Sequence, residues 1–309
     1  MEDALQITGY NPEPNSEFAR KGPAGMPPRD AVFATPDERA RAVKECEQEL
    51  AANKALLSVG FKKQTVEALL RVDQEKINYD LVEKVLQKIC LDGEEGAILV
   101  FMPGLMEIKK VIEACAGNSY IQKATGDGQY LIGLHSSLST AEQRVIFDRP
   151  PPNFRKIVVA TNIAETSITI DDVVYVVDAG RAKENTYNPL TKMQMLLEGW
   201  VSRASAKQRR GRAGRVRPGH CFRLFTRHKH DVRMAEFQLP EIRRVPLEGL
   251  CLQIKLQRME GGVAGFLAKA LEPPDKEAVQ AAIENLQVRV GFIRPATGGG
   301  VVHVHVVAC

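Results

Sequence analysis

The sequence predicts an α/β protein whose main body is a doubly wound, parallel β-sheet. Two observations carry this prediction: short apolar runs recur along the chain from residue 97, and amphipathic helical stretches separate them. A continuous apolar run is typical of a strand that is buried on both faces of a parallel sheet. Strands that alternate with helices are typical of the α/β class.

Five apolar runs are predicted to be strands. They occupy residues 97–101, 130–134, 156–160, 173–177 and 220–225. A helix is predicted at 105–116, and another begins near Ser139, where Ser139 and Glu142 match a capping box. The segments 183–187 and 193–197 flank a turn-forming Asn-Pro-Leu-Thr sequence, which predicts a β-hairpin that projects between the fourth strand and the next helix.

The regions on either side of this α/β pattern are predicted to differ from it. Residues 1–40 are polar, rich in Pro and Gly and without a sustained period, so they predict a linker or flexible arm. Helices are predicted at about 35–55, 65–72 and 79–90, and again at 247–259, 263–271 and 276–287. The last three predict the start of a second, helical module, and residues 288–309 form an apolar, Gly-rich tail.

Length and composition bound the class of protein. The chain has 309 residues, 44% hydrophobic and 26% charged, which is enough apolar material for a sizeable core. At about 100–200 residues per domain, the length allows two domains. No apolar run is long enough to span a membrane and no secretory signal is present. The six cysteines have no paired spacing, so they predict neither disulfides nor a zinc site but an intracellular protein, with nucleus and cytoplasm not distinguished.

Basic residues are concentrated in one stretch. Residues 203–233 hold eleven Lys or Arg and one Asp, a net charge of +10, whereas the whole chain carries +4. Such a local excess favours an anionic partner held at one place, and a solvated basic face is the alternative.

The tail contains two histidines, His303 and His305, which alternate along a predicted strand. No carboxylate or cysteine is near them in the sequence, so no metal site is predicted.

Two loops at predicted strand ends carry candidate binding residues, because ligands of open α/β sheets bind at the carboxyl ends of the strands. Gly104, after the first strand, would let a backbone or phosphate approach closely, and an ordinary turn is the alternative. Residues 161–171, after the third strand, offer small hydroxyls and an amide suited to phosphate and ribose oxygens. Helix capping is the alternative for these hydroxyls.

A third segment, residues 208–215 (Gln-Arg-Arg-Gly-Arg-Ala-Gly-Arg), carries the strongest chemical signal. On a helix, Gln208, Arg212 and Arg215 would share one face. Arginine donors match the charge of a transferring γ-phosphate, and a glutamine can orient the attacking water. Arg209 and Arg210 would point elsewhere and are predicted to make salt bridges or backbone contacts.

These strings resemble a known family. Residues 98–108, 160–173 and 208–215 look like helicase motifs IV, V and VI, in that order. Ala-Thr-Asn-Ile-Ala-Glu-Thr-Ser at 160–167, followed by the 208–215 segment, resembles the DEAH-box RNA helicases of superfamily 2, and residues 134–139 and 237–242 resemble the branch related to RNA helicase A. The resemblance covers about residues 1–10 and 76–287.

The resemblance implies a domain organisation. Residues 76–240 would be the second, RecA-like helicase lobe with its projecting hairpin, preceded by the end of the first lobe and a linker at 1–75. Residues 241–287 would begin a helical module of winged-helix type, and 288–309 match nothing in the family.

The resemblance also implies roles for individual residues. Arg212 and Arg215 match the arginine fingers, and Gln208 matches the glutamine that positions the hydrolytic water. The predicted nucleotide-binding residues are Ser167, which would sense the nucleotide state, Thr169, and Asp171 near the ribose. The predicted RNA-binding residues are Gly104, Thr161, Asn162 and Lys183, the last in the hairpin. Contact with the RNA backbone would be largely independent of sequence and sensitive to salt.

The chain departs from the family pattern in one respect that bears on activity. It contains neither the Gly-Lys-Thr/Ser phosphate loop nor the Asp-Glu-Ala-His box of the first lobe, which would hold most of ATP and Mg²⁺. The chain is therefore expected to be a piece of a longer helicase, inactive alone, whose partners are RNA, ATP and the first lobe. The alternative is a non-catalytic RNA-binding or regulatory module derived from a helicase. The sequence indicates no oligomeric state.

Overall fold

The computed structural model describes residues 1–22, 24, 35–188 and 193–290. The predicted tail beyond residue 290, with His303 and His305, lies outside the described residues, as do the predicted hairpin turn and residues 25–34 of the predicted arm. The chain divides into two compact units. Unit 1 comprises residues 1–184 and 197–238, and unit 2 comprises residues 185–196 and 239–309.

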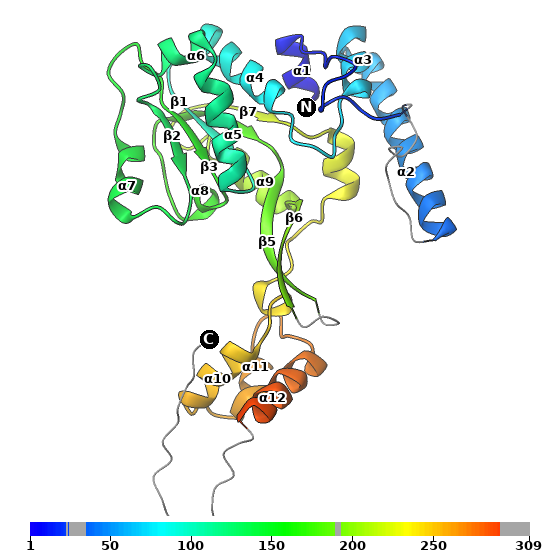
Figure 1. Cartoon of the computed structure of the whole chain (residues 1–309), viewed down its shortest axis with the longest axis vertical. Helices are drawn as coiled ribbons and strands as arrows, with labels where there is room; N and C mark the ends of the chain where they lie inside the picture. Colours follow the sequence, from blue (N-terminus) through cyan, green and yellow to red (C-terminus); the bar gives the residue numbers. More distant parts are fainter. Residues whose placement is uncertain (23, 25–34, 189–192, 291–309) are drawn as a thin grey trace, which may run out of the picture. The chain divides into compact units, whose positions relative to one another are not determined.

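The core of unit 1 is a five-stranded parallel sheet (Figure 1), which confirms the predicted α/β class. The strands are β1 (Ala97–Phe101), β2 (Leu131–Leu134), β3 (Ile157–Ala160), β4 (Val173–Asp178) and β7 (His220–Arg223), in the order β2-β3-β1-β4-β7. Each predicted strand is present, with ends that shift by no more than two residues. The central strand β1 therefore lies between β3 and β4.

Both faces of the sheet are covered, as a doubly wound sheet requires. Alternate residues of β1 point to opposite sides: Ile98 and Val100 belong to one apolar cluster, and Leu99 and Phe101 belong to another. The helices on the first side are α4 (Tyr79–Asp92), α5 (Leu105–Ala116) and α6 (Ser119–Ala124). The cluster on the second side includes α8 (Ile163–Thr166) and the segments that directly follow α7 (Thr140–Arg144) and α9 (Arg203–Arg210), which contribute Ile146 and Ala213.

Helix starts follow the capping residues in the sequence. The predicted capping box at Ser139 and Glu142 is present at the start of α7. Donation from the hydroxyl and the backbone N–H of Ser139 holds the pKa of the Glu142 carboxyl below its usual value. A second capping box, between Thr35 and Glu38, starts α2.

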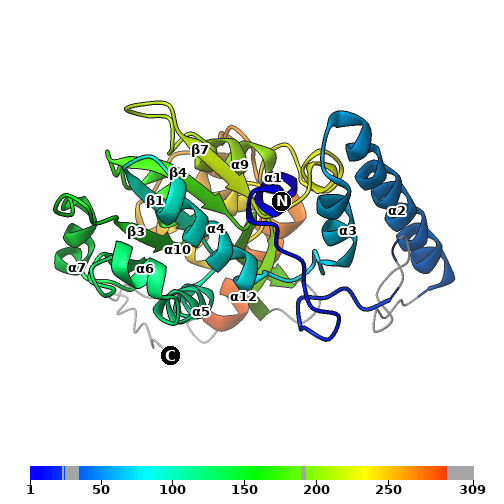
Figure 2. The same cartoon turned by 90° about the horizontal axis from the view of Figure 1, so that it is seen from above.

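The region before the sheet is more ordered than predicted. The predicted helices α2 (Pro36–Ala55) and α3 (Lys63–Arg71) are present and lie side by side (Figures 1 and 2). The prediction of an irregular arm over residues 1–40 was wrong for α1 (Glu2–Thr8), whose Ala4 and Leu5 are buried in the cluster under α4. Two helical turns are too few to display a period in the sequence, so packing and not patterning defines α1.

The predicted hairpin is formed by β5 (Arg181–Asn188) and β6 (Met193–Trp200), which make a separate two-stranded sheet. Its base, residues 181–184 and 197–200, belongs to unit 1, and its outer part belongs to unit 2. Short helical turns complete the described structure: η1 (Leu56–Val59), η2 (Val145–Phe147), η3 (Lys229–Arg233) and η4 (Glu241–Arg243).

Unit 2 is helical beyond the hairpin, as predicted. Its helices are α10 (Glu248–Leu256), α11 (Gly262–Leu267) and α12 (Lys276–Val290). They pack around a small apolar cluster that includes Cys251, Ile254 and Leu267. The winged-helix character of this module stays a prediction. Across the described ranges of both units, no helix combines the length and hydropathy that a membrane crossing requires.

Candidate functional site

The carboxyl edge of the sheet gathers several of the predicted binding residues. Residues 102–104 leave β1 at this edge, and residues 161–171, which we call the hydroxyl loop, leave β3 beside them. The chain after β4 turns at Gly180 into the hairpin on the other side of β1. Because these strands are adjacent and parallel, the predicted nucleotide and RNA residues come from neighbouring loops.

Gly104 and Lys183 lie together at this edge, although they are far apart in the sequence. The Lys183 ammonium donates to both carboxylate oxygens of Glu107 on α5, at 2.8 and 2.9 Å. A Cβ at Gly104 would lie 2.8 Å from a Glu107 oxygen and 2.9 Å from Lys183 Nζ, so a larger residue here would require these two flexible side chains to shift. The charge of Lys183 is thus neutralised within the chain.

The side chains of the hydroxyl loop are mostly solvent-exposed. Asn162, Ser167, Thr169 and Asp171 are exposed and Thr161 is half-buried. The loop is anchored from beneath by apolar residues, among them the buried Ala164 and Ile170, in the cluster on the second face of the sheet. Buried anchors with exposed hydroxyls between them are the arrangement that a ligand-facing loop needs.

The helix-face argument for residues 208–215 was wrong. α9 ends at Arg210, so Gln208 is on the helix but Arg212 and Arg215 lie in the turns that follow. The backbone hydrogen bonds in these turns join residues three apart, as in a 3₁₀ turn. Arg212 N–H donates to Arg209 O at 3.1 Å, and Gly214 N–H donates to Gly211 O at 3.4 Å. Two glycines of low helix propensity explain why the helix stops.

Both arginines nevertheless contact the hydroxyl loop. Arg212, which is largely buried, donates to the backbone oxygens of Ile168, at 2.9 Å, and Glu165. Arg215 is exposed, and its Nη1 donates to Thr169 Oγ1 at 2.5 Å. Burial lowers the pKa of Arg212, and the adjacent positive charge of Arg215 adds to this effect. The structure therefore brings the predicted catalytic arginines and the predicted nucleotide loop together, with Gln208 exposed on α9.

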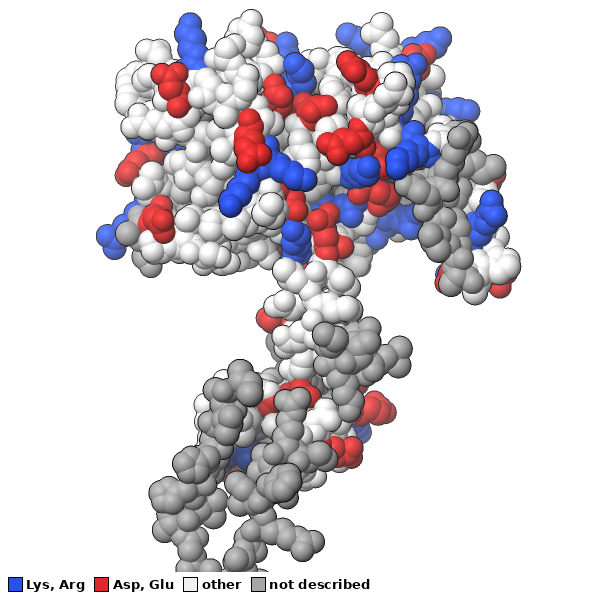
Figure 3. Space-filling view, in the orientation of Figure 1, with Lys and Arg blue, Asp and Glu red and all other residues white. Residues whose placement is uncertain are grey.

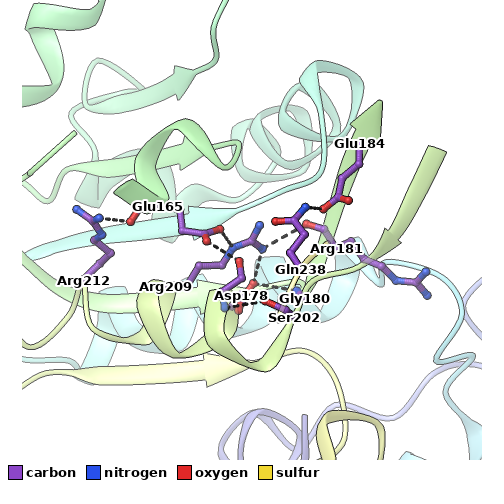
Figure 4. Close-up of polar contacts among 10 residues, drawn as sticks. Glu165, Asp178, Gly180, Arg181, Glu184, Ser202, Arg209, Arg212 and Gln238 are labelled. Carbon is purple, nitrogen blue, oxygen red and sulfur yellow. Dashed lines mark hydrogen bonds and ion pairs between the residues drawn. The ribbon is translucent and has the colours of Figure 1, made fainter. Parts of the chain in front are cut away.

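Arg209 makes the salt bridges that were predicted for it, with partners that the sequence does not reveal (Figure 4). Its guanidinium is fully buried, with Nε 3.0 Å from Glu165 Oε2 and Nη1 2.9 Å from Asp178 Oδ1. Ser205 Oγ donates to the other Glu165 oxygen at 2.6 Å. Burial alone would lower the pKa of Arg209, but the two carboxylates hold it above its ordinary value. One signal was available: Asp178 is a charged residue at the end of an otherwise apolar run.

The described residues offer no cluster of three or more His, Cys, Asp or Glu side chains that could hold a metal ion. What they offer to a phosphate-containing ligand is the exposed guanidinium of Arg215 and the hydroxyls of the 161–171 loop. This donor set fits one side of a nucleotide site and does not include the carboxylates that Mg²⁺ prefers.

Comparisons with known proteins agree with this geometry. Residues 78–217 match the family model of the helicase conserved C-terminal domain. The chain is 52% identical over 207 residues to the DExH-box ATP-dependent RNA helicase DExH4, chloroplastic, of Arabidopsis thaliana, a match covering 67% of this chain and 14% of that protein. It is 44% identical over 226 residues to the human ATP-dependent DNA/RNA helicase DHX36, covering 73% of this chain and 22% of that protein.

A solved structure resembles it as well. The DEAH/RHA helicase HrpB of Escherichia coli superposes with a TM-score of 0.59 and 32% identity, over 72% of this chain and 27% of that one. The sheet and the motifs at its edge therefore define a helicase C-terminal lobe. The chain thus contains the helicase C-terminal domain of the DExH/DEAH-box RNA helicase family. It spans about a fifth or less of the length of the curated relatives named above.

Proposed function

We propose that unit 1 is the second lobe of an ATP-dependent RNA helicase and that it supplies arginine fingers to ATP bound mainly by a first lobe. The observation that carries this proposal is the contact of Arg212 and Arg215 with the hydroxyl loop. Of the two, Arg215 is the exposed guanidinium, so it is the donor better able to reach a γ-phosphate. In this structure the Arg212 guanidinium donates instead to backbone carbonyl oxygens of the hydroxyl loop.

The remaining roles follow from position and chemistry. Gln208, exposed at the end of α9, would orient the attacking water, and Ser167, Thr169 and Asp171 would face the nucleotide. ATP and Mg²⁺ would be held mainly by the first lobe, since the described residues lack a carboxylate cluster for the metal. Preorganised donors that meet charge developing in the transition state accelerate hydrolysis more than they strengthen ATP binding.

For RNA, we propose that the backbone passes along Gly104, Thr161, Asn162 and Lys183. The closeness of Gly104 to Lys183 supports this path, because an RNA phosphate would compete with Glu107 for the Lys183 ammonium at a position where the backbone carries no side chain. On the face of unit 1 that Figure 3 shows, acidic and basic side chains are interspersed, so RNA crossing this face would meet particular cations and not a broad positive field.

The proposal is tested by comparing this chain with the complete gene product. We expect the purified 309-residue chain to bind single-stranded RNA in a salt-sensitive manner and to show no RNA-stimulated ATP hydrolysis. The complete product should hydrolyse ATP faster when RNA is added. Hydrolysis by the chain alone would contradict the division of the site between two lobes. RNA binding without any ATPase in the complete product would instead favour a non-catalytic RNA-binding module.

Glu107→Gln is expected to strengthen RNA binding by the chain. The substitution removes the carboxylate that neutralises Lys183 and frees its ammonium for a phosphate. We expect a dissociation constant about threefold lower at low salt, an advantage that shrinks as salt is added. The measurement is fluorescence anisotropy with a labelled single-stranded RNA.

The matched control for this prediction is Glu113→Gln. Glu113 is exposed on the same helix, so the variant has the same change in net charge without releasing Lys183. If both variants bind RNA equally well, net charge explains the effect and Lys183 has no special role.

A further inference from the structure

We infer that Arg209 is a positioning residue that couples the hydroxyl loop to the base of the β-hairpin. This inference rests on the proposed function for its biological meaning, since the loop would face the nucleotide and the hairpin the RNA. It depends mainly on the contacts of Arg209, Glu165 and Asp178, which are not the proposed arginine fingers. Figure 4 shows these side chains converging between the loop and the hairpin.

The contact with the loop runs through Glu165. Its carboxylate accepts hydrogen bonds from Arg209 Nε at 3.0 Å and from Ser205 Oγ at 2.6 Å, so α9 holds it from two positions. The backbone oxygen of the same residue accepts from Arg212. A displacement of the loop would therefore pull on the arginine fingers and on Arg209 together.

The contact with the hairpin runs through Asp178, at the end of β4. Its Oδ1 accepts from Arg209 Nη1 at 2.9 Å and from the backbone N–H of Gly180 at 2.8 Å. Gly180 O accepts from Val201 N–H at 2.9 Å, a hydrogen bond that joins the two ends of the hairpin at its base. Arg209 Nη1 also lies 3.3 Å from Arg181 O, at the first residue of β5.

The hairpin base is itself held by charged side chains around Trp200, the last residue of β6. The guanidinium of Arg181 lies 3.5 Å from the centre of the indole ring, and the Lys229 ammonium lies 4.8 Å from it. Glu75 accepts from both cations, at 3.2 Å for Arg181. Burial would raise the pKa of Glu75, yet Lys229 and Arg181 outweigh it and hold that pKa below its usual value. These contacts join Arg181, Trp200 and Lys229 at the base of the hairpin.

Burial makes this connection stiff. The side chains of Arg209 and Asp178 have no solvent exposure and that of Glu165 has 14%. A planar guanidinium can bridge two carboxylates at once, which a lysine ammonium does less well, and a buried charge left without its partner is costly. The loop and the hairpin base therefore cannot move independently without breaking a buried ion pair.

The test is amide hydrogen exchange on the full 309-residue chain, with Glu165→Gln as the main variant. The amides of Gly180 and Val201 report on the hairpin base, which Glu165 does not touch. We expect their exchange in Glu165→Gln to accelerate about tenfold, because a hydrogen bond to a charged group is weakened. Asp178→Asn should in turn accelerate exchange in residues 163–168, since coupling is reciprocal. The emission of Trp200, the single tryptophan, gives a second readout.

Three further variants serve as tests and controls. Ser205→Ala loosens Glu165 while leaving every buried charge paired, so it keeps the proposal testable if Glu165→Gln fails to fold. Arg210→Lys changes the exposed neighbour of Arg209 and should alter neither region. Ile121→Val, at a buried site on α6, destabilises unit 1 from the apolar cluster on the other face of the sheet.

The outcomes separate this inference from the proposed function. Faster exchange at Gly180 and Val201 in Glu165→Gln, but not in Ile121→Val, supports the coupling. A change confined to the loop, or an equal acceleration in both variants, overturns it. Because exchange is measured without RNA or nucleotide, the coupling can fail while the complete product remains an RNA-stimulated ATPase, and the reverse also holds.

Discussion

In the complete gene product, Arg215→Ala is expected to reduce ATP hydrolysis by about 10³-fold or more while leaving ATP binding almost unchanged. Arg215 is the exposed guanidinium beside the hydroxyl loop, and such a donor stabilises charge that develops only in the transition state. Single-turnover hydrolysis and equilibrium binding of a labelled nucleotide separate the two quantities.

The control for Arg215→Ala is Lys207→Ala, which removes an exposed charge from α9 and should leave hydrolysis unchanged. Equal losses of binding and hydrolysis in Arg215→Ala would point to a folding defect and would contradict a role in the transition state.

Arg209→Ala is expected to destabilise unit 1 by about 3–5 kcal/mol, because it leaves the fully buried Asp178 carboxylate without its cation. The loss of the second ion pair, to Glu165, acts in the same direction. Urea unfolding followed by the emission of Trp200 measures this, since that residue lies in unit 1 and its signal is not mixed with that of unit 2.

Arg210→Ala is the matched control for that measurement. It removes the same type of side chain from the next position, where the residue is exposed, and should change the free energy of unfolding by less than about 0.5 kcal/mol. A similarly small change in Arg209→Ala would show that the buried ion pairs do not stabilise the lobe.

Much of the fold was predictable because burial leaves a simple pattern in the sequence. The runs at β1 and β3 are apolar throughout, and the run at β4 is apolar up to Asp178, a pattern typical of strands covered on both faces. Capping residues located the start of α7 correctly. The helix α1 escaped prediction because its stability comes from the residues that it packs against, far away in the sequence.

The candidate site was predictable in its residues but not in its geometry. The segment 208–215 was singled out from its arginines and glycines, yet the assumption of a continuous helix failed at Gly211. Glu165 and Asp178 were not paired with Arg209 in advance, because spacing along the chain does not show which loops meet at the edge of a sheet. Those partners follow only from the strand order.

The +10 stretch at 203–233 illustrates the same limit. Its charge was interpreted as a local field that favours an anionic partner, with a solvated face as the alternative. Several of its cations are instead paired inside the chain: Arg209 with Asp178, Lys229 with Glu75, and Arg233 with Glu45 at 2.8 Å. Net charge counted along a sequence therefore overstates what a ligand would meet.

The position of β7 has a practical consequence for anyone who expresses this lobe alone. The match to the helicase C-terminal domain ends at residue 217, whereas β7 (His220–Arg223) is the strand that covers the outer edge of β4. A fragment cut at the end of the match would leave β4, buried along its whole length, as an open edge with unpaired backbone groups. Such an edge invites pairing between chains, so we expect a fragment that includes β7 to aggregate less than one that ends at residue 217.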